Sequence, residues 1–204
     1  MPIGPILLRN GVDVAAPLDL AVPFVEAYGS WDTASADRPT TFGEEDLRHA
    51  NGGGARISAT EIAAILERRR TIERALRAIA PDASLTQAAK SVPWRPLGQL
   101  FGAFADIRGV GFSKMTKALH RKRPALIPIL DSIVQTYLSD DALGAEAPFG
   151  ERALALVRGY KRDVDRNRAV LRALRRELAA RGHELTEVRI LDVVIWSALA
   201  DQGL

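Results

Sequence analysis

The chain has 204 residues and a formal charge of +3, with 47% hydrophobic and 26% charged residues. These values are typical of a globular protein with a sizeable core and exclude wholesale disorder. The absence of cysteine excludes disulfide-linked partners, thiolate catalysis and a cysteine-ligated iron–sulfur cluster. The sequence has no apolar run of membrane-spanning length and no basic segment of the signal-peptide type, so we expect a cytoplasmic protein without a membrane partner.

Apolar residues recur at spacings of three and four along most of the chain, which predicts an all-α fold. Residues 1–16 are expected to be an irregular arm or one short strand. Three capping boxes, beginning at Thr41, Ser58 and Ser84, mark helix starts. Helices are therefore expected over 18–28, 41–50, 58–78, 84–90, 97–106, 112–121, 131–137, 151–181 and 186–200. Gly159 weakens the longest of these helices, and Gly182 is a stop signal after it. We interpret the chain as a single domain of two helical lobes around a cleft, with a seam within 80–96.

A tight turn, Gly109-Val110-Gly111, separates two of the expected helices. Glycines there permit unusual backbone angles, and the free N–H groups that open the next helix suit an anion such as phosphate. The alternative is a plain αα-hairpin whose glycines only let two helices cross closely.

Positive charge gathers around this turn. Residues 1–102 carry 11 basic and 12 acidic groups, whereas residues 103–204 carry 17 and 13. Residues 108–123 hold six Arg and Lys residues and no acid, the charge pattern expected beside a bound phosphate backbone. We therefore expect a nucleic acid as the partner. The residues expected to contact its phosphates are Gly109, Val110, Gly111, Ser113, Lys114, Lys117, Arg121 and Arg123.

Asp131 is the one carboxylate in the apolar stretch Ile127-Pro-Ile-Leu-Asp131-Ser-Ile-Val134 and stands at an expected helix start. An Asp in that position is most often an N-cap that binds free helix N–H groups. A carboxylate at the edge of a cleft can instead stabilise an oxocarbenium ion and orient a water, as in glycosidic bond cleavage. The two roles are compatible, since capping also fixes the carboxylate.

Residues 107–138 resemble the helix-hairpin-helix DNA glycosylase superfamily, which includes endonuclease III and the adenine glycosylase that acts opposite oxidised guanine. The resemblance is carried by Gly109-Val-Gly111 and, twenty residues after Gly111, by Asp131 in the setting Pro128-Ile-Leu-Asp131-Ser-Ile-Val134. It implies two helical lobes around a cleft, base excision from DNA with Asp131 as the catalytic residue, and no cofactor apart from a monovalent cation at the hairpin.

The sequence departs from that family at several positions. Ser113 stands where bifunctional members carry a nucleophilic Lys, so the resemblance implies simple hydrolysis. Met115 is bulky where a small residue is usual, and Arg108 replaces a common Pro. A flipped base needs a stacking surface and polar edge groups, for which Trp94, Gln99, Phe112 and Tyr137 are candidates, whereas Trp196 is expected in the core. The alternatives are a non-catalytic nucleic-acid-binding module and an interaction protein with a purely structural hairpin.

Overall fold

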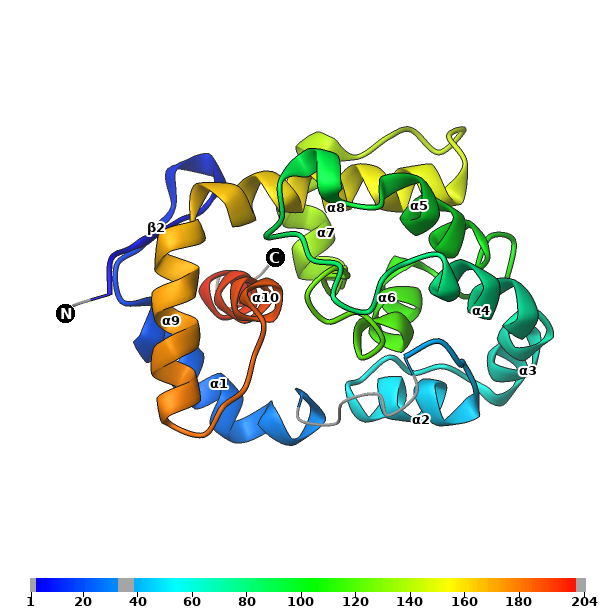
Figure 1. Ribbon diagram of the computed structural model, residues 1–204, viewed down its shortest axis with the longest axis horizontal. Coiled ribbons are helices and arrows are strands. Elements are labelled where there is room, and N and C mark those ends of the chain that lie inside the picture. Colours follow the sequence, from blue (N-terminus) through cyan, green and yellow to red (C-terminus); the bar gives the residue numbers. More distant parts are fainter. Residues whose placement is uncertain (1–2, 33–38, 201–204) are drawn as a thin grey trace.

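Ten α-helices dominate the part of the chain that the structure, a computed structural model, describes, namely residues 3–32 and 39–200 (Figure 1). The predicted all-α fold is therefore confirmed. The expected N-terminal arm contains two very short antiparallel strands, β1 (Ile6–Leu7) and β2 (Asp13–Val14). No helix within the described residues is both long and apolar enough to cross a bilayer.

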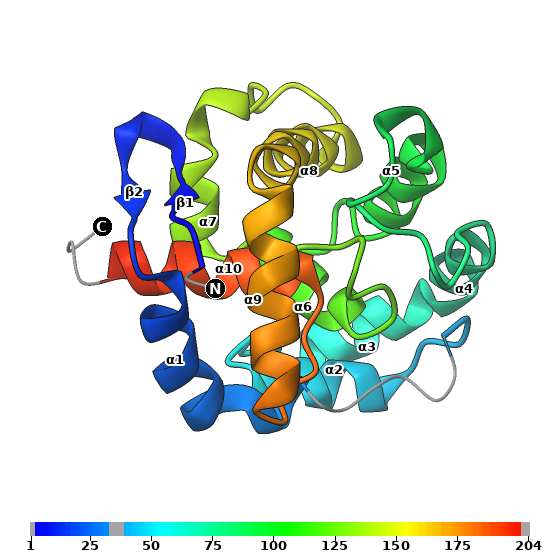
Figure 2. The same cartoon turned by 60° about the vertical axis from the view of Figure 1, so that its left-hand side comes forward.

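The helices fall into two groups that are joined by α7 and α8 (Figures 1 and 2). The terminal group contains the β1–β2 ribbon and three helices that pack together, α1 (Pro17–Asp32), α9 (Arg168–Ala180) and α10 (Glu187–Leu199). The middle group contains α2 (Glu44–Gly52), α3 (Ala59–Glu67), α4 (Arg69–Arg77), α5 (Trp94–Gly102) and α6 (Phe112–His120). The joining helices are α7 (Ser132–Tyr137) and α8 (Phe149–Arg166), and 3-10 turns lie at Arg9–Gly11, Ala89–Ser91 and Ser139–Asp141.

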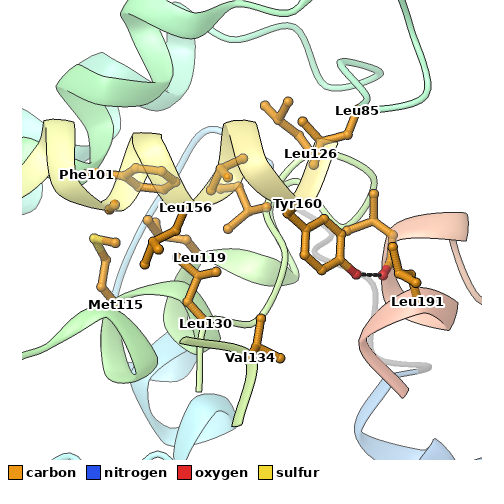
Figure 3. Packing of buried hydrophobic residues seen from close by; sticks show 14 of the residues in the cluster. Leu85, Phe101, Met115, Leu119, Leu126, Leu130, Val134, Leu156, Tyr160 and Leu191 are labelled. Atoms are coloured by element: carbon orange, nitrogen blue, oxygen red, sulfur yellow. Dashed lines mark hydrogen bonds between the residues drawn. The ribbon is translucent and has the colours of Figure 1, made fainter. Parts of the chain in front are cut away.

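One hydrophobic core runs through both groups, with α8 along one side of it (Figure 3). Met115 is fully buried in this core. Tyr160 of α8 is also fully buried, and its hydroxyl donates a 2.6 Å hydrogen bond to the Val188 carbonyl of α10. The long helix α8 thus ties the terminal group to the middle group, since it also packs along α5.

Of the three predicted capping boxes, only the one at Ser58 caps an α-helix at the expected residue. Ser58 caps α3 as predicted, because its Oγ accepts the Glu61 N–H while the Glu61 carboxylate accepts the Ser58 N–H at 2.8 Å. The expected Thr41 cap is wrong by two residues: α2 follows Gly43, whose N–H is bound by the Asp46 carboxylate at 2.9 Å. The box at Ser84 forms only a local turn.

Two helix breaks also differ from expectation. The helix predicted over 58–78 divides at Arg68, and the one over 151–181 divides at Asn167 rather than Gly159. Asn167 binds the Leu7 N–H and carbonyl as well as the Asp163 carbonyl, so tertiary contacts to the ribbon fix this break. Gly182 has a φ of +88° and follows α9, as predicted.

Candidate functional site

A cavity of about 360 Å³ lies where the terminal and middle groups of helices meet. Its walls come from α1, α6, α10, the turn after α2 and the segment that leads into α7. The apolar walls are mainly aromatic, formed by Phe24, Tyr28, Trp31 and Trp196. The polar lining residues are Lys117, Asp131, Arg189 and Asp192, and Gly52–Gly54 form one edge.

Asp131 is at the same time an N-cap and a cavity residue. Its Oδ1 accepts the Val134 N–H at 3.0 Å, which satisfies one of the free donors at the start of α7. The side chain is half-buried and lines the cavity. The capping bond therefore fixes the position of the carboxylate while the side chain still lines the cavity.

Lys117 of α6 lines the same cavity and has no hydrogen bond or ion pair to any residue that the structure describes. Burial lowers its pKa below the ordinary value for lysine, and the nearby cations of Arg189 and Arg56 lower it further. The charge of Asp131 acts in the opposite direction, because a neighbouring anion favours the ammonium form. The cavity thus holds a carboxylate and an amine that interact electrostatically.

Asp192 lies fully buried at the wall formed by α10. One carboxylate oxygen, Oδ2, accepts the Ile129 N–H at 3.0 Å, and Oδ1 has no hydrogen-bond partner among the described residues. Burial raises the Asp192 pKa to about 7, and the charge of Asp131 adds to this shift, although Arg189 opposes it. Asp192 therefore exchanges its proton near neutral pH, unlike an ordinary aspartate.

Arg189 and Trp31 form a layered wall beside the carboxylates. The Arg189 guanidinium binds Asp32 at 2.7 Å and lies 5.4 Å from the ring centres of both Phe24 and Trp31. The Trp31 indole N–H donates to the His49 carbonyl at 2.8 Å. A Cβ on Gly53 would lie 2.6 Å from this indole, so only glycine fits there without displacement of a neighbour. The wall is consequently rigid and closely packed.

Behind Trp31 lies a second cavity, of about 430 Å³, which shares Trp31 and Arg189 with the first. His120 lines it, stacks on Trp31 at 5.8 Å and is buried. Its Nδ1 lies 2.7 Å from the Ile127 carbonyl, which can only accept, so Nδ1 carries the proton. Burial lowers the His120 pKa to about 4, which makes this ring neutral at physiological pH.

The residues proposed from sequence for the base pocket do not line the Asp131 cavity, which corrects that prediction. Trp94 lies under Arg158 and bonds to the Ala89 carbonyl. Phe112 packs on Phe149, Gln99 is exposed on α5, and the buried Tyr137 hydroxyl accepts the Arg9 N–H.

The aromatic walls were missed because most of them come from α1, about a hundred residues before Asp131. Phe24, Tyr28 and Trp31 are spaced by four and three residues, which places them on one helix face. That spacing was the available signal in the sequence. Trp196 was expected in the core and instead contributes to the cavity wall.

The hairpin glycines lie at the turn before α6, as predicted, but outside this cavity. Gly109 has a φ of +83°, and the Glu61 carboxylate occupies the space where a Cβ would stand. Lys114 binds both oxygens of that carboxylate, at 2.7 and 2.8 Å. An internal anion therefore sits against the turn that we expected to hold phosphate. Of the other predicted contacts, Val110 is buried and Ser113 is half-buried.

The basic residues after the hairpin are mostly structural. Arg123 is fully buried, and its guanidinium donates to the carbonyls of Leu76, Ile79, Pro39 and Lys122. Its predicted contact with phosphate is therefore wrong, because the side chain is inside the protein. Arg121 lies beside Glu45 and Asp46. Lys117 is the one predicted phosphate contact that lines the Asp131 cavity.

Comparison with known proteins gives a family for nearly the whole chain. The sequence profile of a family of unknown function, DUF6308, matches residues 23–199. The chain belongs to DUF6308. That span includes every residue that lines the Asp131 cavity of this DUF6308 protein. No curated protein and no solved structure matches it.

Proposed function

We propose that this DUF6308 protein binds DNA and hydrolyses the N-glycosidic bond of a flipped base, in the manner of a monofunctional helix-hairpin-helix glycosylase. The observation that carries the proposal is the position of Asp131, held by its capping bond at the edge of an aromatic cavity. The cavity volume of about 360 Å³ falls within the range of small-ligand sites. Planar rings stack well on aromatic walls, as a flipped base requires.

The chemistry we propose uses the fixed carboxylate at the reacting carbon. As the bond between the base and the sugar breaks, positive charge develops on the sugar, and Asp131 stabilises it across a short distance in a partly desolvated site. The same carboxylate orients the water that adds to the sugar, while the departing base keeps the electron pair of the broken bond and takes up the proton that the water loses. Lys117, as the cation beside Asp131, is placed to interact with the phosphate next to the extruded nucleotide.

The two helix groups correspond, in this proposal, to the two glycosylase lobes. The cavity at their meeting place is lined by α1 and α10 on one side and by α6 and the turn after α2 on the other. An extruded base would enter between Gly52–Gly54 and Asp131. The exposed Arg56 follows this glycine edge and supplies positive charge for the DNA backbone.

Asp131→Asn tests the catalytic role directly. Asn is as good an N-cap as Asp, so the fold is expected to persist while the charge is lost. We expect unchanged affinity for duplex DNA and loss of base excision, measured as alkali-labile sites across a panel of damaged duplexes. Asp82→Asn, at an exposed position outside the cavity, is the matched control. If the wild-type protein cuts no duplex in the panel, the glycosylase proposal fails.

A second candidate function is a small-molecule site with a purely structural hairpin. The Glu61–Lys114 pair favours it, because the expected phosphate seat already holds a carboxylate. In that case the cavity binds a free ligand and the protein does not bind DNA. Duplex affinity at low salt separates the two candidates, since phosphate contacts are strongest there.

A further inference from the structure

Lys117 differs from the other lysines of the chain in its surroundings. Three of those lysines bind a carboxylate at 2.6–2.7 Å, in the pairs Lys114–Glu61, Lys122–Asp46 and Lys161–Asp165. Lys90 is exposed on the surface. Lys117 lines the aromatic cavity and has no hydrogen bond or ion pair to any residue in the described part of the chain. Its amine is therefore left for a ligand.

The amine of Lys117 lies at the glycine edge of the cavity and is open to it. A Cβ on Gly54 would lie 3.9 Å from Lys117 Nζ, and Gly54 is itself a cavity residue. The Lys117 side chain is half-buried, and Nζ is not one of the fully buried side-chain atoms that lack a partner within the described residues. Nζ therefore keeps accessible surface, and a molecule in the cavity can reach it.

The charges around Lys117 favour its uncharged form. Burial lowers the pKa of Lys117, and the charge of Asp131 opposes this shift. The cations of Arg189 and Arg56 lower the pKa further. A lysine that is desolvated beside other cations presents more of the uncharged amine, which is the nucleophilic form. The other titratable or charged side chains that line the cavity are Tyr28, Asp131, Arg189 and Asp192.

The cavity walls indicate the kind of molecule that would meet this amine. Phe24, Tyr28, Trp31 and Trp196 form the apolar lining, and such surfaces favour a flat ring over a flexible aliphatic chain. The wall cannot easily widen at the glycine edge, because Gly53 already lies against the Trp31 indole. An uncharged amine reacts readily with a carbonyl carbon. A flat ring that carries an aldehyde group fits both conditions.

We propose that Lys117 captures a small planar aldehyde, stacked in the aromatic cavity, by forming an imine with its carbonyl carbon. The nitrogen lone pair makes the new C–N bond, the C–O bond breaks, and both amine hydrogens leave with the carbonyl oxygen as water. No oxidant or reductant is needed. This inference goes beyond the proposed function, since it requires neither DNA nor a base. The proposed function uses Lys117 as a cation, whereas imine formation uses the uncharged amine.

Trapping with benzaldehyde and sodium cyanoborohydride at neutral pH tests the proposal. The reductant delivers hydride to the imine carbon, which leaves a stable benzyl group on each lysine that has reacted. Peptide mapping by mass spectrometry at partial labelling then gives the rate at every lysine. We expect Lys117 to react roughly 10-fold faster than the exposed Lys90, because more of it is uncharged and the walls hold the ring beside it. A rate at Lys117 equal to or below that at Lys90 would overturn the proposal.

A second aldehyde and two variants sharpen the test. Propanal has no ring, so the ratio of the Lys117 rate to the Lys90 rate should be severalfold lower with propanal than with benzaldehyde. Equal ratios contradict stacking on the aromatic walls and overturn the proposal. Lys117→Arg keeps a positive charge and should lose the fast site, whereas Lys90→Arg should keep it. Fast labelling that persists in Lys117→Arg also overturns the assignment, and if that variant does not fold, the mapped wild-type rates decide.

The outcome is separable from that of the glycosylase proposal. If no duplex is cut and Lys117 is still the fast site for benzaldehyde, the glycosylase proposal fails and the Lys117 assignment holds. If bases are excised and Lys117 reacts no faster than Lys90, the Lys117 assignment fails alone.

Discussion

Two fully buried titratable side chains have pKa values shifted in opposite directions. Burial raises the pKa of Asp192 to about 7 and lowers that of His120 to about 4. Burial disfavours the charged form in both cases, which explains the opposite signs for an acid and a base. Asp192 faces Arg189, Tyr160 and Asp131, whereas His120 faces Arg189, Asp32 and His49.

These shifts predict that the free energy of unfolding changes little with pH, because the contributions of the two groups oppose each other. Between about pH 4 and 7 native Asp192 holds a proton that the unfolded chain lacks, so its contribution to the free energy of unfolding falls as pH rises. Between about pH 4 and 6.5 the unfolded chain holds a proton on His120 that the native state lacks, so that contribution rises with pH. Each is of order 3–5 kcal/mol.

Urea denaturation across this pH interval checks the prediction. The wild-type protein should show a shallow dependence, because the two contributions oppose each other. Asp192→Asn removes the falling contribution, so stability should then rise clearly from pH 4 to 6.5. Parallel curves for the variant and the wild type would show that Asp192 does not titrate there.

At the scale of elements, the hairpin before α6 is held by a carboxylate from α3. Glu61 caps α3, lies against Gly109 and binds Lys114. Glu61→Gln keeps the capping box, in which Gln serves as well as Glu, and removes the charge. If the hairpin can take a backbone phosphate, the variant should bind duplex DNA severalfold more tightly at low salt and with a steeper salt dependence, by about one released ion.

Fluorescence anisotropy of a labelled duplex over a salt series measures this change. Glu67→Gln is the control, since Glu67 is exposed at the end of the same helix and has no contact with Lys114. Unchanged affinity in Glu61→Gln would mean that the hairpin is purely structural, as the second candidate function requires.

The helices themselves were largely predictable from sequence, because their signals are local. Ser58 with Glu61, Asp131 and Gly182 all act within one turn of their own helix, and each appears as expected. The break at Asn167 was not predictable, because it depends on contacts to Leu7 far earlier in the chain.

The residues of the candidate site divide in the same way, into those with a signal in the nearby sequence and those whose surroundings come from distant parts of the chain. Lys117 could be found because it lies within the basic stretch 108–123, and Asp131 because it is the one carboxylate in the apolar stretch 127–134. The buried environment of Arg123 could not, because its four carbonyl partners include residues more than forty positions away. The aromatic wall from α1 reaches Asp131 only through the packing of α1 on α10.

At the scale of the whole molecule, the contact between Trp31 and Gly53 joins the terminal group to the middle group. Gly53→Ala would place a methyl group 2.6 Å from the indole, although its φ of −84° suits any residue. We expect a loss of about 1–3 kcal/mol in unfolding free energy from overpacking. Gly52→Ala, whose new methyl would lie 3.8 Å from Trp31, is the matched control.

Chemical denaturation of both variants provides the readout. The prediction requires Gly53→Ala to be affected and Gly52→Ala to behave like the wild-type protein. Equal effects in the two variants would point to backbone changes in the glycine turn rather than to the Trp31 contact.

The pairing of α1 with α10 also sets the order in which the chain can fold as it is made. Ribosomes add about 5–20 residues per second, and α1 is released well before its packing partner α10, which lies about 150 residues later in the chain. The middle group of helices can therefore fold before α10 is available to pack against α1. The aromatic cavity is therefore completed only after α10 is released, so a nascent chain stalled before Glu187 lacks Asp192, Arg189 and Trp196 and cannot form the cavity.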